Sequence, residues 1–117
     1  MDQDSYYYYT MGEESVQKGE IDTAVKYYLK SVRRNRHFKT FERLYECYSK
    51  LDQLDLANYF LELAYEENKN NDQVAFLYSL SLIQEKQRDK AGEILRSIIQ
   101  RNPDYKRAKT EYEKIFG

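Results

Sequence analysis

The chain has 117 residues and a net charge of −1, with 33% charged and 41% hydrophobic residues. This length suits one compact domain, and the balanced charge gives no electrostatic reason to expect nucleic acid or an anionic membrane as a partner. One proline and four glycines are too few turn residues for a many-stranded β protein, so the composition favours helices.

The first expected element contains four consecutive tyrosines, "SYYYYTMGEES". Tyr8, Met11, Gly12 and Ser15 follow the i, i+3, i+4, i+7 spacing of one helical face, so they are predicted to pack inward. Tyr6 and Tyr9 then share another face at i, i+3, which makes them candidate binding tyrosines. Tyr7 receives no role.

The next segment begins an internal repeat. "GEIDTAVKYYLKSV", "DQLDLANYFLELAY" and "KQRDKAGEILRSII" align without a gap, and their alanines Ala24, Ala57 and Ala91 are 33 and 34 residues apart. Each segment has the apolar spacing of an amphipathic helix. The aspartate two residues before each alanine is expected to cap its helix.

A second helix is predicted before each of these segments. In the later repeats it carries the stripes Phe41, Leu44, Tyr45, Tyr48 and Ala75, Tyr78, Ser79, Leu82. A seventh helix, over residues 104–116, is expected to start at Pro103 and Asp104 and to cap the stack. The repeats then cover residues 5–37, 38–71 and 72–105 of a single domain, 1–117.

This pattern of small, aromatic and alanine positions resembles the tetratricopeptide repeat (TPR) family, most closely in "TMGEESVQKGEIDTAVKYYLKSV". The resemblance implies an all-α fold, a right-handed α-α superhelix (a TPR solenoid) of seven antiparallel helices. It also implies that the first helix of each repeat lines a concave groove. Tyr45 departs from the family, which prefers a small residue there beside the alanine of the partner helix. We expect Tyr45 to tilt that pair apart or to swing outward.

Residues beside the packing stripes are predicted to face the groove and bind a partner. They are Tyr6, Tyr9, Glu13, Val16 and Gln17 in the first repeat, Lys39, Glu42, Glu46 and Ser49 in the second, and Gln73, Phe76, Leu80 and Ile83 in the third. The apolar row of the third repeat indicates a partner-binding patch. The alternative is that this row packs against the seventh helix or a neighbouring repeat.

These features favour a non-enzymatic adaptor that binds a peptide or helix of another protein, with Glu13, Glu42 and Glu46 selecting basic side chains on it. The alternative is a self-associating structural protein, joined through exposed apolar helix faces. No catalytic set, metal-ligand spacing or phosphate-binding loop is present, so no catalytic residue, metal or cofactor is expected.

Three further features concern ligand class and location. The basic run "RRNRHFK" is interpreted as cations at a helix C-terminus. Within the TPR family, one subgroup grips chaperone C-termini through basic groove residues, but the matching positions here are Tyr9, Glu13, Arg43, Gln73 and Leu77, which disfavours that mode. The lone Cys47, with no apolar span and no signal pattern, predicts a cytoplasmic location.

Overall fold

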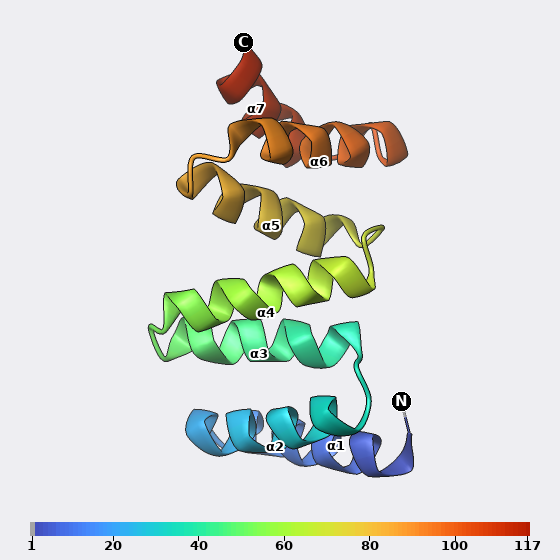
Figure 1. Cartoon of the computed structure of the whole chain (residues 1–117), viewed down its shortest axis with the longest axis vertical. Coiled ribbons are helices and arrows are strands. Elements are labelled where there is room, and N and C mark those ends of the chain that lie inside the picture. Colours follow the sequence, from blue (N-terminus) through green and yellow to red (C-terminus); the bar gives the residue numbers. More distant parts are fainter. Residues whose placement is uncertain (1) are drawn as a thin grey trace. The chain divides into compact units, whose positions relative to one another are not determined.

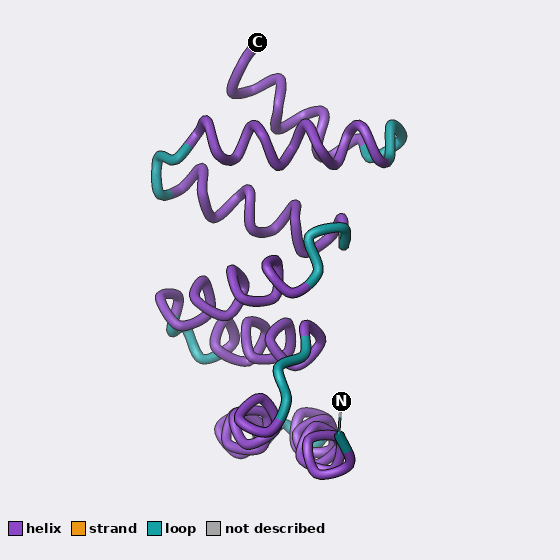
Figure 2. Tube along the Cα trace, turned by 45° about the vertical axis from the view of Figure 1, so that its right-hand side comes forward, coloured by secondary structure: helices purple, strands orange, loops and turns teal. Residues whose placement is uncertain are grey.

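The computed structural model describes residues 2–117, and every regular element in that range is a helix. The helices are α1 Gln3–Gln17, α2 Ile21–Arg34, α3 Phe38–Lys50, α4 Leu54–Glu67, α5 Asp72–Gln84, α6 Arg88–Arg101 and α7 Lys106–Phe116. Short loops join them (Figure 2). The chain divides into two compact units: the first holds α1–α4 and ends at Glu67, and the second begins at Asn68 and holds α5–α7.

Within each unit, successive helices reverse direction, so that α2 and α4 of the first unit run the same way (Figure 1). Helix α1 packs on α2, α3 on α4 and α5 on α6, while α2 also contacts α3 and α6 contacts α7. The three alanines that mark the repeat, Ala24, Ala57 and Ala91, are all buried. The two-helix repeat predicted from the sequence is therefore present three times, followed by a seventh helix.

The turn inside each helix pair has one construction in all three repeats. The residue after the first helix's cap is left-handed, with φ of 77° at Gly19, 58° at Asp52 and 63° at Lys86. Its amide donates to the carbonyl three residues back, and the next amide donates to the carbonyl five back, as in Glu20 N to Ser15 O at 2.9 Å. This is the Schellman arrangement, which satisfies free carbonyls at the end of a helix.

Helix capping differs from the prediction. Asp22, Asp55 and Asp89 lie inside the first turns of α2, α4 and α6, and the residues at the caps of α2 and α6 make no side-chain hydrogen bond. The predicted aspartate caps are wrong for these helices, because the tight turn places the helix start one or two residues earlier. The aspartates instead favour the positive end of the helix dipole.

Side-chain caps belong to the first helix of each pair. Asp2 accepts from Ser5 N at 2.7 Å, His37 Nδ1 from Lys39 N at 3.3 Å, and Asn71 from Val74 N at 3.0 Å. In each of these helices a side chain supplies the acceptor that a free amide of the first turn needs.

The small residue Gly12 is required by Tyr28. A Cβ at Gly12 would stand 2.6 Å from Cε1 of the buried Tyr28 ring, whereas the family resemblance predicts the alanine of the partner helix as the crowded neighbour. The residues that repeat Tyr28 are the leucines Leu61 and Leu95. In the second pair Tyr45 replaces the glycine, yet Tyr45 is half-buried and Ala57 stays buried, so that pair remains packed.

The start of α1 is fastened to the end of α2 by two fully buried serines. Ser5 Oγ donates to Ser31 O at 2.9 Å, and Ser31 Oγ donates to Ser5 O at 2.8 Å. Tyr8 was predicted to be core, but it is half-exposed and stacks on Tyr27 with ring centroids 6.5 Å apart. The residue that anchors this end of α1 in the core is therefore Ser5, which directly precedes the four tyrosines.

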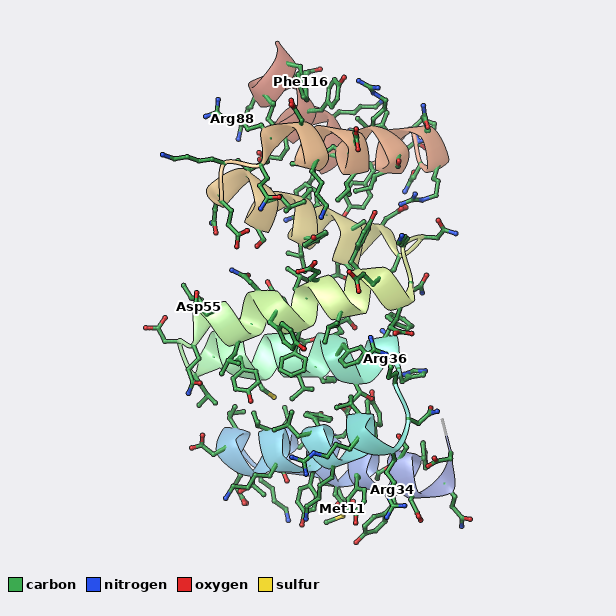
Figure 3. All side chains as sticks on the ribbon, in the orientation of Figure 1. Met11, Arg34, Arg36, Asp55, Arg88 and Phe116 are labelled. Carbon is green, nitrogen blue, oxygen red and sulfur yellow. The ribbon has the colours of Figure 1, made fainter. Side chains whose placement is uncertain are left out.

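In the second unit, α7 packs on the earlier helices through the fully buried Ala108. It begins at Lys106, two residues later than predicted, because Pro103 and Asp104 form the preceding turn. The ring of Phe116 on α7, labelled in Figure 3, covers Gly92 of α6, where a Cβ would stand 2.5 Å from the ring's Cζ.

We predict that Lys86→Gly stabilises the protein and Gly19→Ala destabilises it, each by about 1 kcal/mol. A left-handed conformation costs a residue with a Cβ about 1–2 kcal/mol, and glycine returns part of that gain as unfolded-state entropy. Asp52→Gly should gain less, since aspartate tolerates this conformation better than lysine. Urea unfolding measures all three, and a loss of stability in Lys86→Gly would contradict the strain argument.

We further predict that Gly12→Ala lowers the free energy of unfolding by about 1–3 kcal/mol, because the new methyl group overpacks against Tyr28. The same substitution in a Tyr28→Leu background should cost much less, since leucine is the residue that the other two repeats use. Equal costs in both backgrounds would show that the Tyr28 ring is not the cause.

Candidate functional site

A cavity of about 280 Å³ with a largely polar lining lies between α1 and α3 of the first unit. Helix α1 supplies Glu13, Val16 and Gln17, and α3 supplies Arg43, Glu46, Cys47 and Lys50. The four predicted groove residues Glu13, Val16, Gln17 and Glu46 are thus brought together.

Arg43 connects the walls of this cavity. Its Nε donates to Glu13 Oε1 at 2.8 Å, and one terminal nitrogen donates to Glu46 Oε1 at 2.9 Å. The same Glu13 oxygen accepts from the Tyr28 hydroxyl at 2.5 Å. A single carboxylate therefore joins α1 to α2 and to α3.

This network shifts the acidity of its members. Burial opposes the charge of Arg43, but the hydrogen bond and charge of Glu13, with Glu46, outweigh it and raise the pKa of the guanidinium. Burial, and then the hydrogen bond to Glu13, raise the pKa of Tyr28. Arg43 stays charged and Tyr28 stays neutral, so both remain donors to Glu13.

Glu42 does not face a ligand as predicted. Only 8% of it is exposed, and its Oε1 lies 3.2 Å from Lys39 Nζ and 3.8 Å from Arg43. Arg43 lies within ion-pair distance of Glu13, Glu42 and Glu46. The expectation that all three carboxylates are free to select a basic ligand is therefore wrong. Glu46 is the most open of them, with 45% of its side chain exposed.

The predicted row on α3 was one residue out of register on the cavity wall. The predicted row was Lys39, Glu42, Glu46 and Ser49, whereas the lining residues besides Glu46 are Arg43, Cys47 and Lys50. The missed residues have helical i, i+4, i+7 spacing, which could have identified the row. Burial raises the pKa of the Cys47 thiol to about 11, so Cys47 contributes bulk rather than a reactive thiolate.

The candidate binding tyrosines differ in their surroundings. Tyr6 is 62% exposed. Tyr9 is half-buried, with its ring centroid 5.8 Å from that of Tyr28. Burial raises the pKa of Tyr9, with Arg43 acting against the rise and Glu13 adding to it, so its hydroxyl lies beside the Arg43 network.

The third-repeat residues lie in the second unit, which is described by itself. Gln73 is exposed, Leu80 and Ile83 are half-buried, and Phe76 is only 3% exposed. Phe76 contacts the Tyr105 ring at 5.7 Å between centroids, and the Arg107 guanidinium lies 4.5 Å above its ring. The prediction that Phe76 faces an open groove is wrong, and the alternative, packing by the seventh helix, is confirmed for this residue.

Unlike Phe76, Leu80 stays partly open to solvent. With Phe76 it lines a cavity of about 270 Å³ whose other wall is Lys106, Arg107, Thr110 and Glu111 of α7.

Between residues 2 and 117, no group of three or more His, Cys, Asp or Glu side chains is placed to hold a metal ion. Nor does any helix of that range have the length and apolarity needed to cross a membrane.

Comparisons with solved structures identify the fold. The first TPR of Spaghetti (RPAP3), bound to the HSP90 peptide SRMEEVD, superimposes with a TM-score of 0.74 at 16% identity, over 98% of this chain and 92% of that one. The C-terminal TPR-containing domain of a Plasmodium falciparum FK506-binding protein gives 0.70 at 18% identity, over 97% and 87%.

The Yersinia enterocolitica type III secretion translocator chaperone SycD gives 0.67 at 18% identity, over 98% and 90%. No protein-family model and no curated protein matches the sequence. At these identities the likeness establishes the fold, so this chain has the all-α fold of tetratricopeptide repeats, as the repeated sequence predicted.

We predict a measurable coupling between Glu13 and Arg43. Both side chains are about two-thirds buried, so a double-mutant cycle with Glu13→Gln and Arg43→Met should give about 1 kcal/mol, above the usual value for exposed pairs. The matched cycle with Glu46→Gln should give less, because the Glu46 side chain is more exposed. Equal coupling energies would contradict the central position of Glu13.

Proposed function

We propose that this chain is a non-enzymatic protein-interaction module that binds an extended peptide segment of a partner across the cavity between α1 and α3. The observation that carries the proposal is the cavity itself, in which four residues chosen from the sequence as groove residues converge with three more from α3. The TPR fold supports the proposal, because stacked helix pairs offer extended surfaces rather than closed pockets.

The cavity suits a segment with an apolar side chain and a basic one. Val16 supplies apolar wall, and Tyr9 lies one helical turn from Glu13. Glu46 uses Oε1 for Arg43, which leaves its other oxygen to accept from a lysine or arginine of the ligand. Gln17 adds an amide that can hydrogen-bond the ligand backbone.

An acidic ligand is less suited to this site. The RPAP3 domain is bound to a peptide that ends in EEVD. Here Arg43 already pairs with Glu13 and Glu46, so it offers no free charge to a ligand carboxylate, and the two glutamates would repel one. Lys50 at the cavity edge, which forms no ion pair within residues 2–117, is the cation left for an acidic or carbonyl group flanking the core of the ligand.

The test is selection of a random peptide library on the full chain, followed by titration of the enriched peptides. Peptides containing a basic and an apolar residue should be enriched. Their affinity should fall about tenfold, or 1.4 kcal/mol, in a Gln17→Ala/Glu46→Gln variant. Glu14→Gln is the matched control, since Glu14 is exposed on α1 and does not line the cavity.

Two results would contradict the proposal. One is enrichment of peptides that bind the cavity variant and the Glu14 control equally well. The other is failure to enrich any peptide on a chain whose circular dichroism shows it fully helical.

A further inference from the structure

A second open surface lies between α2 and α4 of the first unit. It contains a cavity of about 210 Å³ whose lining is mostly apolar: Leu29, Val32, Phe41, Tyr59, Phe60 and Leu63, with Arg33 and Arg36 at its edge. Arg36, labelled in Figure 3, closes one end, because its Nε donates to Glu67 at 2.9 Å and its guanidinium lies 5.1 Å above the Phe41 ring.

Helix α4 adds an exposed apolar stripe to this surface. Leu56, Tyr59 and Leu63 have the i, i+3, i+7 spacing of one face, with Leu56 42% exposed and Tyr59 56% exposed. Large apolar side chains gathered in this way beside an apolar cavity, rather than scattered singly, mark an interaction surface.

The two helices that border the cavity carry opposite charge. Helix α2 has the cations Lys26, Lys30, Arg33 and Arg34 against one carboxylate, Asp22. Helix α4 has four carboxylates, Asp55, Glu62, Glu66 and Glu67, and no cation. Lys30 lies over the rings of Tyr8 and Tyr27, and Arg34 pairs with Asp4, so Arg33 is the α2 cation that lines the cavity. On α4, Glu67 pairs with Arg36, whereas Glu62 and Glu66 are exposed. The surface is therefore apolar along its middle, with Arg33 on the α2 side and two exposed carboxylates on the α4 side.

Such a surface is complementary to a copy of itself. Because α2 and α4 run in the same direction (Figure 1), a two-fold axis along the cavity sets the α2 of one chain against the α4 of the other. The contact occurs twice, as a symmetric dimer requires. Apolar residues meet apolar residues along the axis, and Arg33 of α2 meets the exposed carboxylates of α4 on both sides.

One charge pair can be specified. Arg33 and Glu66 are 33 residues apart, which is the repeat spacing, so they hold equivalent places on α2 and α4. Both are exposed. Under the two-fold axis each Arg33 lies opposite the other chain's Glu66, where opposite charges attract and like charges would repel.

We propose that a second copy of this chain binds this α2/α4 surface and forms a symmetric dimer in which Arg33 pairs with Glu66 across the axis. The proposal is independent of the peptide function above, because no residue lining the α1/α3 cavity also lines this one.

Sedimentation equilibrium of the full chain over a range of concentrations tests the proposal. The wild type should show a monomer–dimer equilibrium. Arg33→Glu alone and Glu66→Arg alone should each weaken the dimer about tenfold or more, because each places two like-charged pairs in the interface. An equimolar mixture of the two variants should dimerise again, because both pairs are then opposite in charge.

Control variants separate this result from general effects. Glu14→Arg and Lys18→Glu change the charge of exposed residues in the last turn and at the C-cap of α1, and they should leave the dimer unchanged. Tyr59→Ala should weaken association while the helical circular dichroism stays native. The Gln17→Ala/Glu46→Gln variant should dimerise normally, so a failure here is distinguishable from a failure of the peptide function.

A wild type that remains monomeric at every concentration would overturn the proposal. So would single variants that lose the dimer without recovery in the mixture, since that result would show a dimer built on another surface.

Discussion

The fold depends on a left-handed residue that ends the first helix of each pair. At Gly19, Asp52 and Lys86 the chain reverses within a few residues, and two backbone hydrogen bonds close the turn each time. Because the turn has the same geometry in each repeat, the second helix always starts at the same place relative to the first. That constant start is what keeps the apolar stripes of the two helices facing each other, and it explains why these helices need no side-chain cap.

Given that reversal, side-chain size decides how close the two helices approach. The first pair combines Gly12 with Tyr28, and the large ring occupies the space that a Cβ would need. The ring's hydroxyl then extends past the glycine to Glu13, which also accepts from Arg43 of α3. The packing of Tyr28 against Gly12 inside the first repeat therefore also positions a hydrogen-bond donor in the polar network that joins the first repeat to the second.

The repeat, the seven helices and the fold could be predicted from the sequence, because alanines at 33 and 34 residues and the stripes beside them are local patterns. The hydrogen-bond partners of buried polar side chains could not be predicted in this way. Ser5 and Ser31 are 26 residues apart and have no spacing that marks them as a pair, yet they bond reciprocally in the core. Tyr8 looked like core because it has the right period, but the stripe on α1 turns toward Ser5 and away from it.

The same limit applied to the site. Helical spacing identifies rows of residues on a helix, but it does not fix which of two adjacent rows faces the cavity. A shift of one position places Arg43 in the cavity wall instead of Glu42, which is buried. The exchange matters because the buried row decides which charges are already paired. Phe76 shows the second limit, since whether an apolar row is open or covered depends on where α7 packs, and the row's own sequence is the same in both cases.

Alternation of the helices separates the two candidate surfaces of the first unit. The cavity lined by Glu13 and Arg43 is built from first helices, α1 and α3, whereas the apolar cavity at Leu29 and Tyr59 is bordered by second helices, α2 and α4. The buried layer of Ala24, Tyr28, Leu44 and Leu61 belongs to neither surface. A repeat of two helices therefore lets one short chain carry two chemically different surfaces, a polar one centred on the paired charges of Arg43, Glu13 and Glu46 and an apolar one with charged residues at its edges.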